Sequence, residues 1–174
     1  MTPVARIVIM AGGTGGHVFP ALALARILRS ESYEVVWLGT RRGLEARVVP
    51  AESIAIEWLS IGGLRGKGPT TLIAAPFRLL LALWQVMQIM RKHQPAVVVG
   101  LGGFVTGPGG VAAWLLRRPL IIHEQNAVAG FTNRCLARLA CMVLVAFPGS
   151  FGSQVVTQVI GNPVRQEILA TPPP

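Results

Sequence analysis

Short β-branched runs alternate with longer helical patterns along the whole of this chain. Near-continuous apolar strands separated by helices are typical of a parallel sheet that is covered on both faces and joined by right-handed crossovers. The sequence therefore predicts an α/β fold, a Rossmann-like doubly wound parallel sheet. The seven expected strands are residues 6–10, 35–38, 54–59, 96–100, 120–123, 142–146 and 155–160.

The composition is that of one domain with a hydrophobic core. Of the 174 residues, 52% are hydrophobic, and a chain of this length can bury a core of ordinary size. We expect one domain over residues 1–170. The closing segment TPPP, residues 171–174, cannot continue a helix and is predicted to begin an interdomain linker.

The net charge of +9 favours an anionic partner, either a phosphorylated ligand, an anionic membrane surface or nucleic acid. Nucleic acid is disfavoured, because aromatic residues make up only 6% of the chain and lie mostly in apolar segments. All seven acidic residues are Glu, so the chain has no Asp-x-Asp motif to hold a divalent cation between sugar-nucleotide phosphates. We therefore expect no metal and no other cofactor.

The cysteines and the first residues indicate the compartment. Cys135 and Cys141 are too few for a zinc cluster or a disulfide framework, so we interpret them as reduced thiols. Residues 4–10 are too short for the apolar region of a secretory signal and run directly into glycines, which predicts a strand. We expect a cytoplasmic location.

The loops that follow the expected strands are rich in glycine and polar residues. In a doubly wound sheet the ligand binds beyond the carboxyl ends of the strands, so these loops are the first candidates for function. We expect a ligand site at this edge of the sheet. In order, the loops read AGGTGGH, GTRR, IGGLRGKG, GLGGFVTGPGG, HEQN, FPGS and GNPVR.

The first loop, residues 11–17, leads from a strand into a helix and is suited to binding phosphate. Backbone N–H groups of a glycine turn can approach an anion closely, and the helix N-terminus adds about half a positive charge. The dinucleotide fingerprint is incomplete, because Val18 stands at the position of its third glycine and no acid ends the second strand. Arg41 and Arg42 after that strand keep an NADP-dependent oxidoreductase as the alternative, unless they are solvated surface charges.

His17 stands where this loop enters the helix. A helix N-terminus disfavours the imidazolium form, so a neutral ring that can accept a proton is expected near pH 7. The functional interpretation is a general base. The structural alternative is a histidine that caps the helix or bonds to a neighbouring loop.

Five segments in order resemble the MurG family of bacterial peptidoglycan N-acetylglucosaminyltransferases. They are MAGGTGGHVFPALALA, SIGGLRGKG, GLGGFVTGPGG, IIHEQNAVAGFTN and VIGNPVR. The resemblance implies the N-terminal half of a metal-independent glycosyltransferase of the GT-B fold. In that family, the N-terminal half binds the lipid-linked acceptor. We find no counterpart in this sequence of the family's C-terminal donor domain, which carries a Gly-Gly-Ser loop.

The implied reaction moves N-acetylglucosamine (GlcNAc) from UDP-GlcNAc to the 4-hydroxyl of undecaprenyl-diphospho-muramoyl-pentapeptide, with inversion. It belongs to cell-wall synthesis and hence to cell shape and division. The resemblance implies that His17 is the base that takes the hydroxyl proton. It also implies contacts to UDP-GlcNAc from Thr14, Gly15, Gly16, Asn126 and Arg165.

Two further groups of residues are assigned less directly. Glu124 either orients His17 or binds a sugar hydroxyl, unless it forms an ion pair with a nearby arginine. The second glycine loop, residues 102–110, resembles a further anion cradle and fits the acceptor's diphosphate, with Gly102, Gly103 and Thr106 as its candidate residues. The alternative for this loop is tight packing between a strand and a helix.

The segment Thr70 to Arg91 predicts an apolar helix that does not cross a membrane. About 20 apolar residues are needed for a span, and Pro76, Arg78, Gln85 and Gln88 interrupt this one. Its apolar arc is wider than a core-facing stripe requires, so we expect a partly exposed face, although full burial in the core is the alternative. With the nearby cations Arg65, Lys67, Arg78, Arg91 and Lys92, an exposed face suits peripheral contact with the cytoplasmic face of the anionic inner membrane. The contact residues would be Ile73, Phe77, Leu80 and Trp84.

Overall fold

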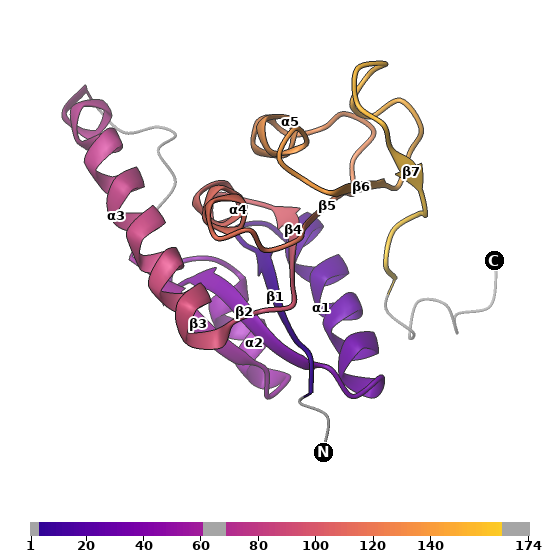
Figure 1. The fold of residues 1–174 in the computed structure, drawn as a ribbon, viewed down its shortest axis with the longest axis horizontal. Coiled ribbons are helices and arrows are strands. Elements are labelled where there is room, and N and C mark those ends of the chain that lie inside the picture. The colour runs from indigo at the N-terminus through magenta and orange to yellow at the C-terminus, as the bar shows by residue number, and fades with distance from the viewer. Residues whose placement is uncertain (1–3, 61–68, 165–174) are drawn as a thin grey trace.

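The protein is a single parallel sheet between two layers of helices (Figure 1). The computed structural model describes residues 4–60 and 69–164, and for residues 69–74 the backbone alone. Seven strands pair in the order β3-β2-β1-β4-β5-β6-β7, and each neighbouring pair is parallel. The predicted doubly wound α/β fold is confirmed.

The strands are β1 (Arg6–Ala11), β2 (Glu34–Thr40), β3 (Ala55–Leu59), β4 (Val97–Gly102), β5 (Leu120–Glu124), β6 (Met142–Val145) and β7 (Gln158–Val159). The helices are α1 (Gly15–Ser30), α2 (Glu45–Ala51), α3 (Pro69–His93), α4 (Thr106–Leu115) and α5 (Phe131–Leu136). The predicted helix 70–91 is therefore present, two residues longer at its C-terminus. The predicted strand 155–160 is reduced to β7, whose two residues are both exposed at the edge of the sheet.

The two faces of the sheet carry separate hydrophobic cores. Because successive strand residues point to opposite faces, Ile7 and Ile9 of β1 pack with α1 and α2, whereas Val8 and Met10 pack with α3, α4 and α5. Trp37 of β2 is fully buried on the first face. The central strands are apolar on both sides for this reason, which is the pattern that predicted the fold.

The strand order reverses at β1, which lies between β2 and β4. Ala11 at the end of β1 pairs with Gly102 at the end of β4. The loops that follow these two strands therefore leave the sheet side by side. Such a reversal point is where doubly wound sheets form their ligand crevice.

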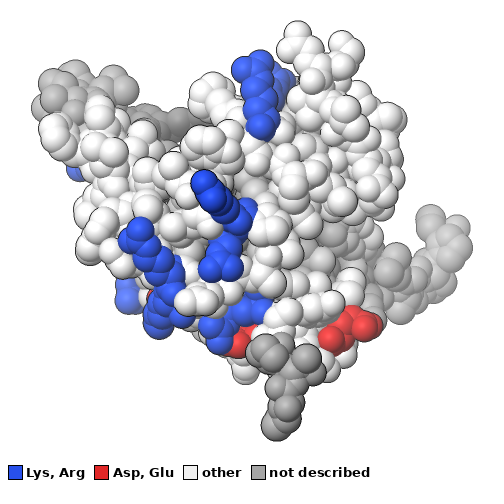
Figure 2. Space-filling model, viewed as in Figure 1, with Lys and Arg blue, Asp and Glu red and all other residues white. Residues whose placement is uncertain are grey.

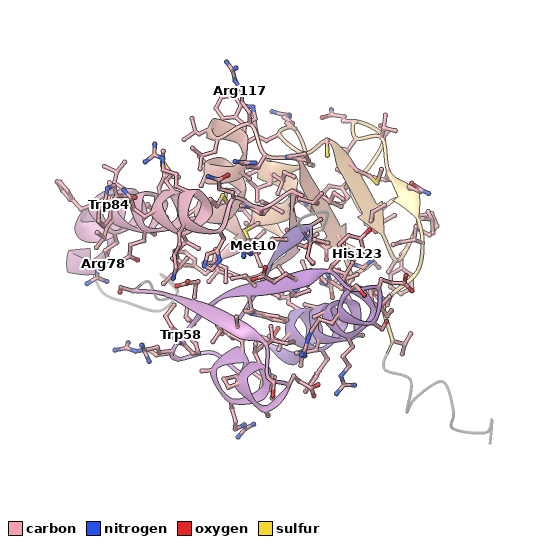
Figure 3. The ribbon with its side chains drawn as sticks, turned by 60° about the horizontal axis from the view of Figure 1, so that its bottom comes forward. Met10, Trp58, Arg78, Trp84, Arg117 and His123 are labelled. Atoms are coloured by element: carbon pink, nitrogen blue, oxygen red, sulfur yellow. The ribbon has the colours of Figure 1, made fainter. Side chains whose placement is uncertain are left out.

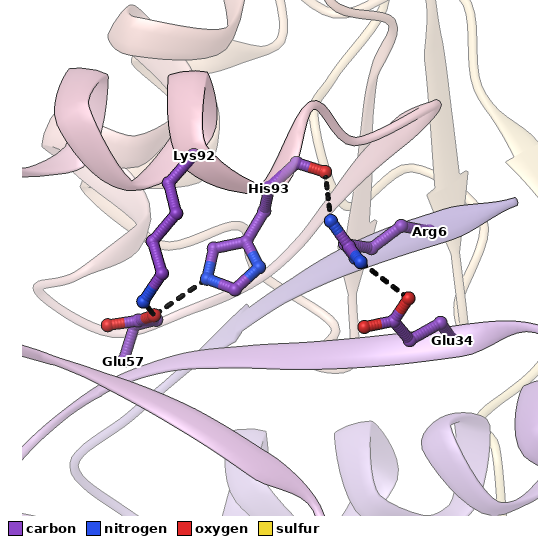
Figure 4. Close-up of polar contacts among 5 residues, drawn as sticks. All are labelled: Arg6, Glu34, Glu57, Lys92 and His93. Atoms are coloured by element: carbon purple, nitrogen blue, oxygen red, sulfur yellow. Dashed lines mark hydrogen bonds and ion pairs between the residues drawn. The ribbon is translucent and has the colours of Figure 1, made fainter.

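Ion pairs gather around the C-terminal end of α3 (Figure 4). Arg6 at the start of β1 donates to Glu34 at 2.7 Å and to the carbonyl of His93 at 2.7 Å. Glu57 of β3 lies 2.7 Å from Lys92 Nζ and 2.6 Å from His93 Nε2. Burial alone would raise the pKa of Glu57, but these two basic partners hold it below its ordinary value. The pairs connect three strands to the C-terminal end of α3, and none of them involves the glycine loops after β1 and β4.

Candidate functional site

The glycine loop after β1 presents an open helix N-terminus. Gly13 has φ +91°, a conformation that suits glycine, and α1 begins at Gly15. Thr14 precedes the helix in an extended conformation, and its side chain makes no capping hydrogen bond. The first N–H groups of a helix have no intrahelical partner and carry partial positive charge. This end of α1 is therefore suited to an anion, as the sequence predicts.

A buried carboxylate holds the loop from behind. Glu45, at the start of α2, is fully buried. One of its oxygens accepts from Gly13 N at 2.9 Å, and the other accepts from the amide and hydroxyl of Thr40 at 3.0 and 2.9 Å. Glu45 thus ties the loop after β1 to the end of β2. Sequence reasoning missed this role, and the only signal was an acid that follows GTRRGL.

The glycine loop after β4 packs directly against the first loop. Gly102 and Gly103 have φ values of +124° and +87°. A Cβ on Gly102 would lie 2.7 Å from the His17 ring, and a Cβ on Gly103 would collide with the carbonyl oxygen of Gly12. Only glycine permits this close approach. The two loops therefore lie against each other, with His17 at their contact.

Thr106, a candidate for the acceptor's diphosphate, is fully buried at the start of α4. Its hydroxyl lies 2.8 Å from the carbonyl oxygen of Gly102 and 3.3 Å from both Gly102 N and the Met10 carbonyl. The hydroxyl is therefore engaged in fixing the end of β4. A diphosphate contact in this loop would fall to its backbone.

His17 lies in the first turn of α1 and is partly buried. Its Nδ1 is 3.0 Å from Oε1 of Gln125, which follows β5 and is buried. The Gln125 amide nitrogen in turn lies 3.0 Å from His123 Nδ1 and 3.1 Å from the His123 carbonyl oxygen. Figure 3 shows His123 among the strands in the middle of the molecule. Three side chains that the sequence places in two separate motifs thus form one connected group.

Glu124 has hydrogen-bond partners other than those that the sequence suggested. It is fully buried and accepts from Asn133 Nδ2 at 2.9 Å, from Gly130 N at 3.1 Å, and from the amide and backbone N–H of Asn126 at 2.8 and 3.1 Å. Burial alone would raise the pKa of Glu124, but these four bonds outweigh it and lower the pKa. In the described part of the chain neither His17 nor an arginine is bonded to Glu124, so its contacts favour support of the exposed Asn126.

The remaining candidates lie away from this group. Arg165 lies outside the described residues. Arg41, on which the NADP alternative depends, stacks over the ring of Trp58 at 5.1 Å from its centre. Within residues 4–60 and 69–164, no cluster of three or more His, Cys, Asp or Glu side chains is arranged to hold a metal ion.

The outer face of α3 is apolar and exposed. Phe77, Leu80 and Trp84 are 75%, 64% and 58% exposed, and Leu81 is 49% exposed. The side chain of Ile73 lies outside the described residues. The opposite face of the helix is buried in the core through Ala82, Val86 and Met90. Figure 3 shows Trp84 and Arg78 on the outer part of this helix, and no described helix meets the length and hydropathy of a membrane span.

A doubly wound parallel sheet with an uncapped helix N-terminus and a histidine at its reversal point belongs to the class of Rossmann-like ligand-binding domains. The sequence profile of the glycosyltransferase family 28 N-terminal domain matches residues 7–145. The chain belongs to this family. The oxidoreductase alternative receives no support from these comparisons.

Individual relatives agree with the family. The chain is 63% identical over 163 residues to a protein of Nitrosococcus oceani named UDP-N-acetylglucosamine–N-acetylmuramyl-(pentapeptide) pyrophosphoryl-undecaprenol N-acetylglucosamine transferase, covering 94% of this chain and 45% of the relative. A protein of Alkalilimnicola ehrlichii with the same name is 61% identical, covering 97% and 47%. The crystal structure of Acinetobacter baumannii MurG superimposes with a TM-score of 0.80 at 46% identity, covering 90% of this chain and 45% of that one. The chain thus spans about half the length of the proteins it matches.

Proposed function

We propose that this chain is the acceptor-binding half of an inverting N-acetylglucosaminyltransferase of peptidoglycan synthesis. The donor would be UDP-GlcNAc and the acceptor undecaprenyl-diphospho-muramoyl-pentapeptide, as the names of the relatives suggest. The observation that carries the proposal is the position of His17, which lies at the open N-terminus of α1 and against both glycine loops. One domain of residues 1–170 and a linker at 171–174 remain part of this proposal.

In the proposed reaction His17 takes the proton of the acceptor's 4-hydroxyl. The hydroxyl oxygen forms a bond to the anomeric carbon of GlcNAc while the bond from that carbon to the UDP oxygen breaks on the opposite face. UDP leaves with the electron pair. Thr14, Gly15 and Gly16 would face the phosphates and sugar of the donor, together with Asn126 and Arg165. The backbone of Gly102 and Gly103 would face the acceptor's diphosphate, near the Thr106 hydroxyl that fixes this loop.

The test compares His17→Ala with the unchanged sequence in a full-length enzyme that contains this domain. Removal of a general base lowers the rate by roughly 100- to 10,000-fold, so kcat should fall by that amount while UDP-GlcNAc still binds. The matched control is His93→Ala, because His93 lies at the opposite end of the sheet beside Glu57. A His17→Ala enzyme with near-normal kcat and an unchanged pH profile would contradict the proposal.

We also propose that the exposed face of α3 rests on the cytoplasmic face of the inner membrane. Its apolar side chains suit the interfacial region, and nearby cations would each contribute about 1 kcal/mol on an anionic surface. On the face in Figure 2, most of the surface is uncharged, and its charged side chains are mainly Lys and Arg, with Glu at the lower margin. The lipid tail of the proposed acceptor requires such a position.

Vesicle binding tests this second proposal. Phe77→Ser, Leu80→Ser and Trp84→Gln together should weaken sedimentation with anionic vesicles and leave the melting temperature nearly unchanged, because these side chains are exposed. Trp114→Gln on α4 is the control, since its side chain is 53% exposed on another helix. A collapse of the melting temperature with normal sedimentation of the folded remainder would show that the α3 face is part of the core.

A further inference from the structure

Gln125 lies between two histidines that are far apart in the sequence. Its Oε1 is 3.0 Å from His17 Nδ1, and its Nε2 is 3.0 Å from His123 Nδ1. His123 Nε2 is 3.0 Å from the carbonyl oxygen of Gly161. A continuous chain of hydrogen bonds therefore runs from a backbone carbonyl to the ring of His17.

The carbonyl end determines the protonation of His123. A carbonyl oxygen can only accept, so His123 Nε2 must carry the hydrogen of this bond. Burial lowers the pKa of His123, although the bond to Gly161 and the charge of Glu124 oppose this effect. The ring is therefore neutral near pH 7, and its Nδ1 is an acceptor.

The protonation of His123 in turn determines the orientation of the Gln125 amide. His123 Nδ1 and the His123 carbonyl oxygen are both acceptors, and the Gln125 amide nitrogen lies within 3.1 Å of each. An NH₂ group has two hydrogens and satisfies both, whereas the reversed amide would place its oxygen against two acceptors. Oε1 of Gln125 consequently faces His17 Nδ1, and that nitrogen must be the donor.

We propose that Gln125 is a positioning residue that holds neutral His17 in the tautomer with its hydrogen on Nδ1 and a lone pair on Nε2. The close approach of Gly102 to the Nδ1 and Cε1 edge of the ring leaves no room for another side chain there. Among the described residues, none forms a hydrogen bond with Nε2 of His17. Free imidazole side chains favour the opposite tautomer, so the Gln125 bond reverses an intrinsic preference.

The tautomer has a chemical consequence for the proposed reaction. A bare Nε2 can take a proton from a hydroxyl, whereas an Nε2 that carries hydrogen cannot. The use of Nε2 as the base rests on the proposed function. The tautomer itself follows from the geometry alone, and it can be measured without any substrate.

The test is ¹⁵N NMR of the 174-residue chain with labelled histidine, observed through the ring protons across a pH titration. The chain has three histidines, at positions 17, 93 and 123, so assignment requires only single substitutions. Neutral His17 should show a protonated Nδ1 and a bare Nε2, and His123 should show the reverse in the same spectrum. A neutral His17 with hydrogen on Nε2 would overturn the proposal without any variant.

Two substitutions at position 125 separate positioning from general structure. Gln125→Met removes the acceptor at nearly the same size, so the His17 signals should move toward the opposite tautomer. Gln125→Glu keeps an acceptor opposite His17 Nδ1 and should retain the His17 tautomer, while His123 changes. The matched control is Gln85→Met on α3, where the amide bonds only to Ser60 N among the described residues. An unchanged His17 tautomer in Gln125→Met would refute the role of Gln125.

Activity gives an independent result in a full-length enzyme. Gln125→Met should lower kcat about tenfold, because one hydrogen bond shifts the balance of two tautomers by roughly that factor, and KM for UDP-GlcNAc should change less. If the tautomers are as proposed but His17→Ala keeps its rate, the proposed function fails and the assignment of the tautomer stands. If His17→Ala is inactive but the tautomer is reversed, the present proposal fails alone.

Discussion

The two glycine loops at the sheet edge look alike in sequence and differ in structure. In the loop after β1, a Cβ on Gly13 would have nothing within 4 Å, and a Cβ on Gly16 would meet only the Thr14 hydroxyl at 3.9 Å. In the loop after β4, Cβ atoms on Gly102 and Gly103 would strike the His17 ring and the Gly12 carbonyl. Gly13 and Gly16 therefore face open space in the first loop, although Gly12 and Gly15 lie against Glu45 and Phe19, whereas Gly102 and Gly103 allow close packing in the second loop.

The difference changes how the second loop is interpreted. Beyond Gly103, a Cβ on Gly109 would collide with the sulfur of Met10, and one on Gly110 would lie 2.6 Å from Leu136. The packing alternative therefore accounts for these glycines without a ligand. In the first loop, by contrast, open space lies beside Gly13 and Gly16.

The largest expected loss of stability comes from a comparison of Gly13→Ala with Gly103→Ala. The first substitution only strains the backbone conformation, whereas the second also makes the added methyl collide with backbone. Gly13 and Gly103 have similar φ values, +91° and +87°, but only Gly103 has backbone in its way. Gly13→Ala should lower the free energy of unfolding by about 1–2 kcal/mol from the backbone conformation alone. Gly103→Ala should lower it by about 3 kcal/mol or more, because backbone overlap adds to that strain. Urea denaturation of both variants gives the comparison, and equal losses would contradict it.

A smaller effect is expected from the carboxylate behind the first loop. Glu45→Gln turns an NH₂ group toward one of the donors that Glu45 now satisfies, which should cost about 1–3 kcal/mol of unfolding free energy. The matched control is Glu31→Gln, the same change at an exposed position after α1, with an expected effect within about 0.5 kcal/mol. Thermal melting measures both. An unchanged melting temperature for Glu45→Gln would show that the first loop does not depend on Glu45.

The smallest effect on stability should come from Gly16→Ala. Its Cβ meets open space, and alanine is the better helix former, so stability should rise by about 0.5 kcal/mol. If the donor phosphates approach this turn as proposed, the added methyl should still raise KM for UDP-GlcNAc in a full-length enzyme. Higher stability together with an unchanged KM for UDP-GlcNAc would place the donor elsewhere. The open space in the first loop would then have no proposed ligand.

The fold was predictable because its signals are local. Apolar runs mark β1, β2 and β4, and glycines follow the ends of β1 and β4. β7 was overpredicted because a β-branched run at a sheet edge has little apolar surface to cover, so only two of its six residues pair. Local pattern cannot distinguish an edge strand from an irregular segment.

The candidate site was less predictable, because its contacts join distant segments. The motif HEQN drew attention to Glu124 as a charged group, but the neighbour of His17 is the uncharged Gln125, 108 residues away in the chain. Which of two adjacent side chains points toward α1 depends on where β5 ends, and sequence alone does not fix that. The partly exposed face of α3 was predicted from the width of its apolar arc, which is larger than one core-facing stripe requires.

The reversal of strand order at β1 has a consequence for synthesis on the ribosome. Ile7 pairs with Val35 on one side and with Val97 on the other, so the second partner is made 90 residues after Ile7 (97 − 7). At a translation rate of roughly 5–20 residues per second, β4 is synthesised about 5–18 s after β1. During that interval one edge of a strand that is buried in the folded protein is open to other nascent chains. Chaperone dependence of this protein should therefore be greatest while β4 is still inside the ribosome.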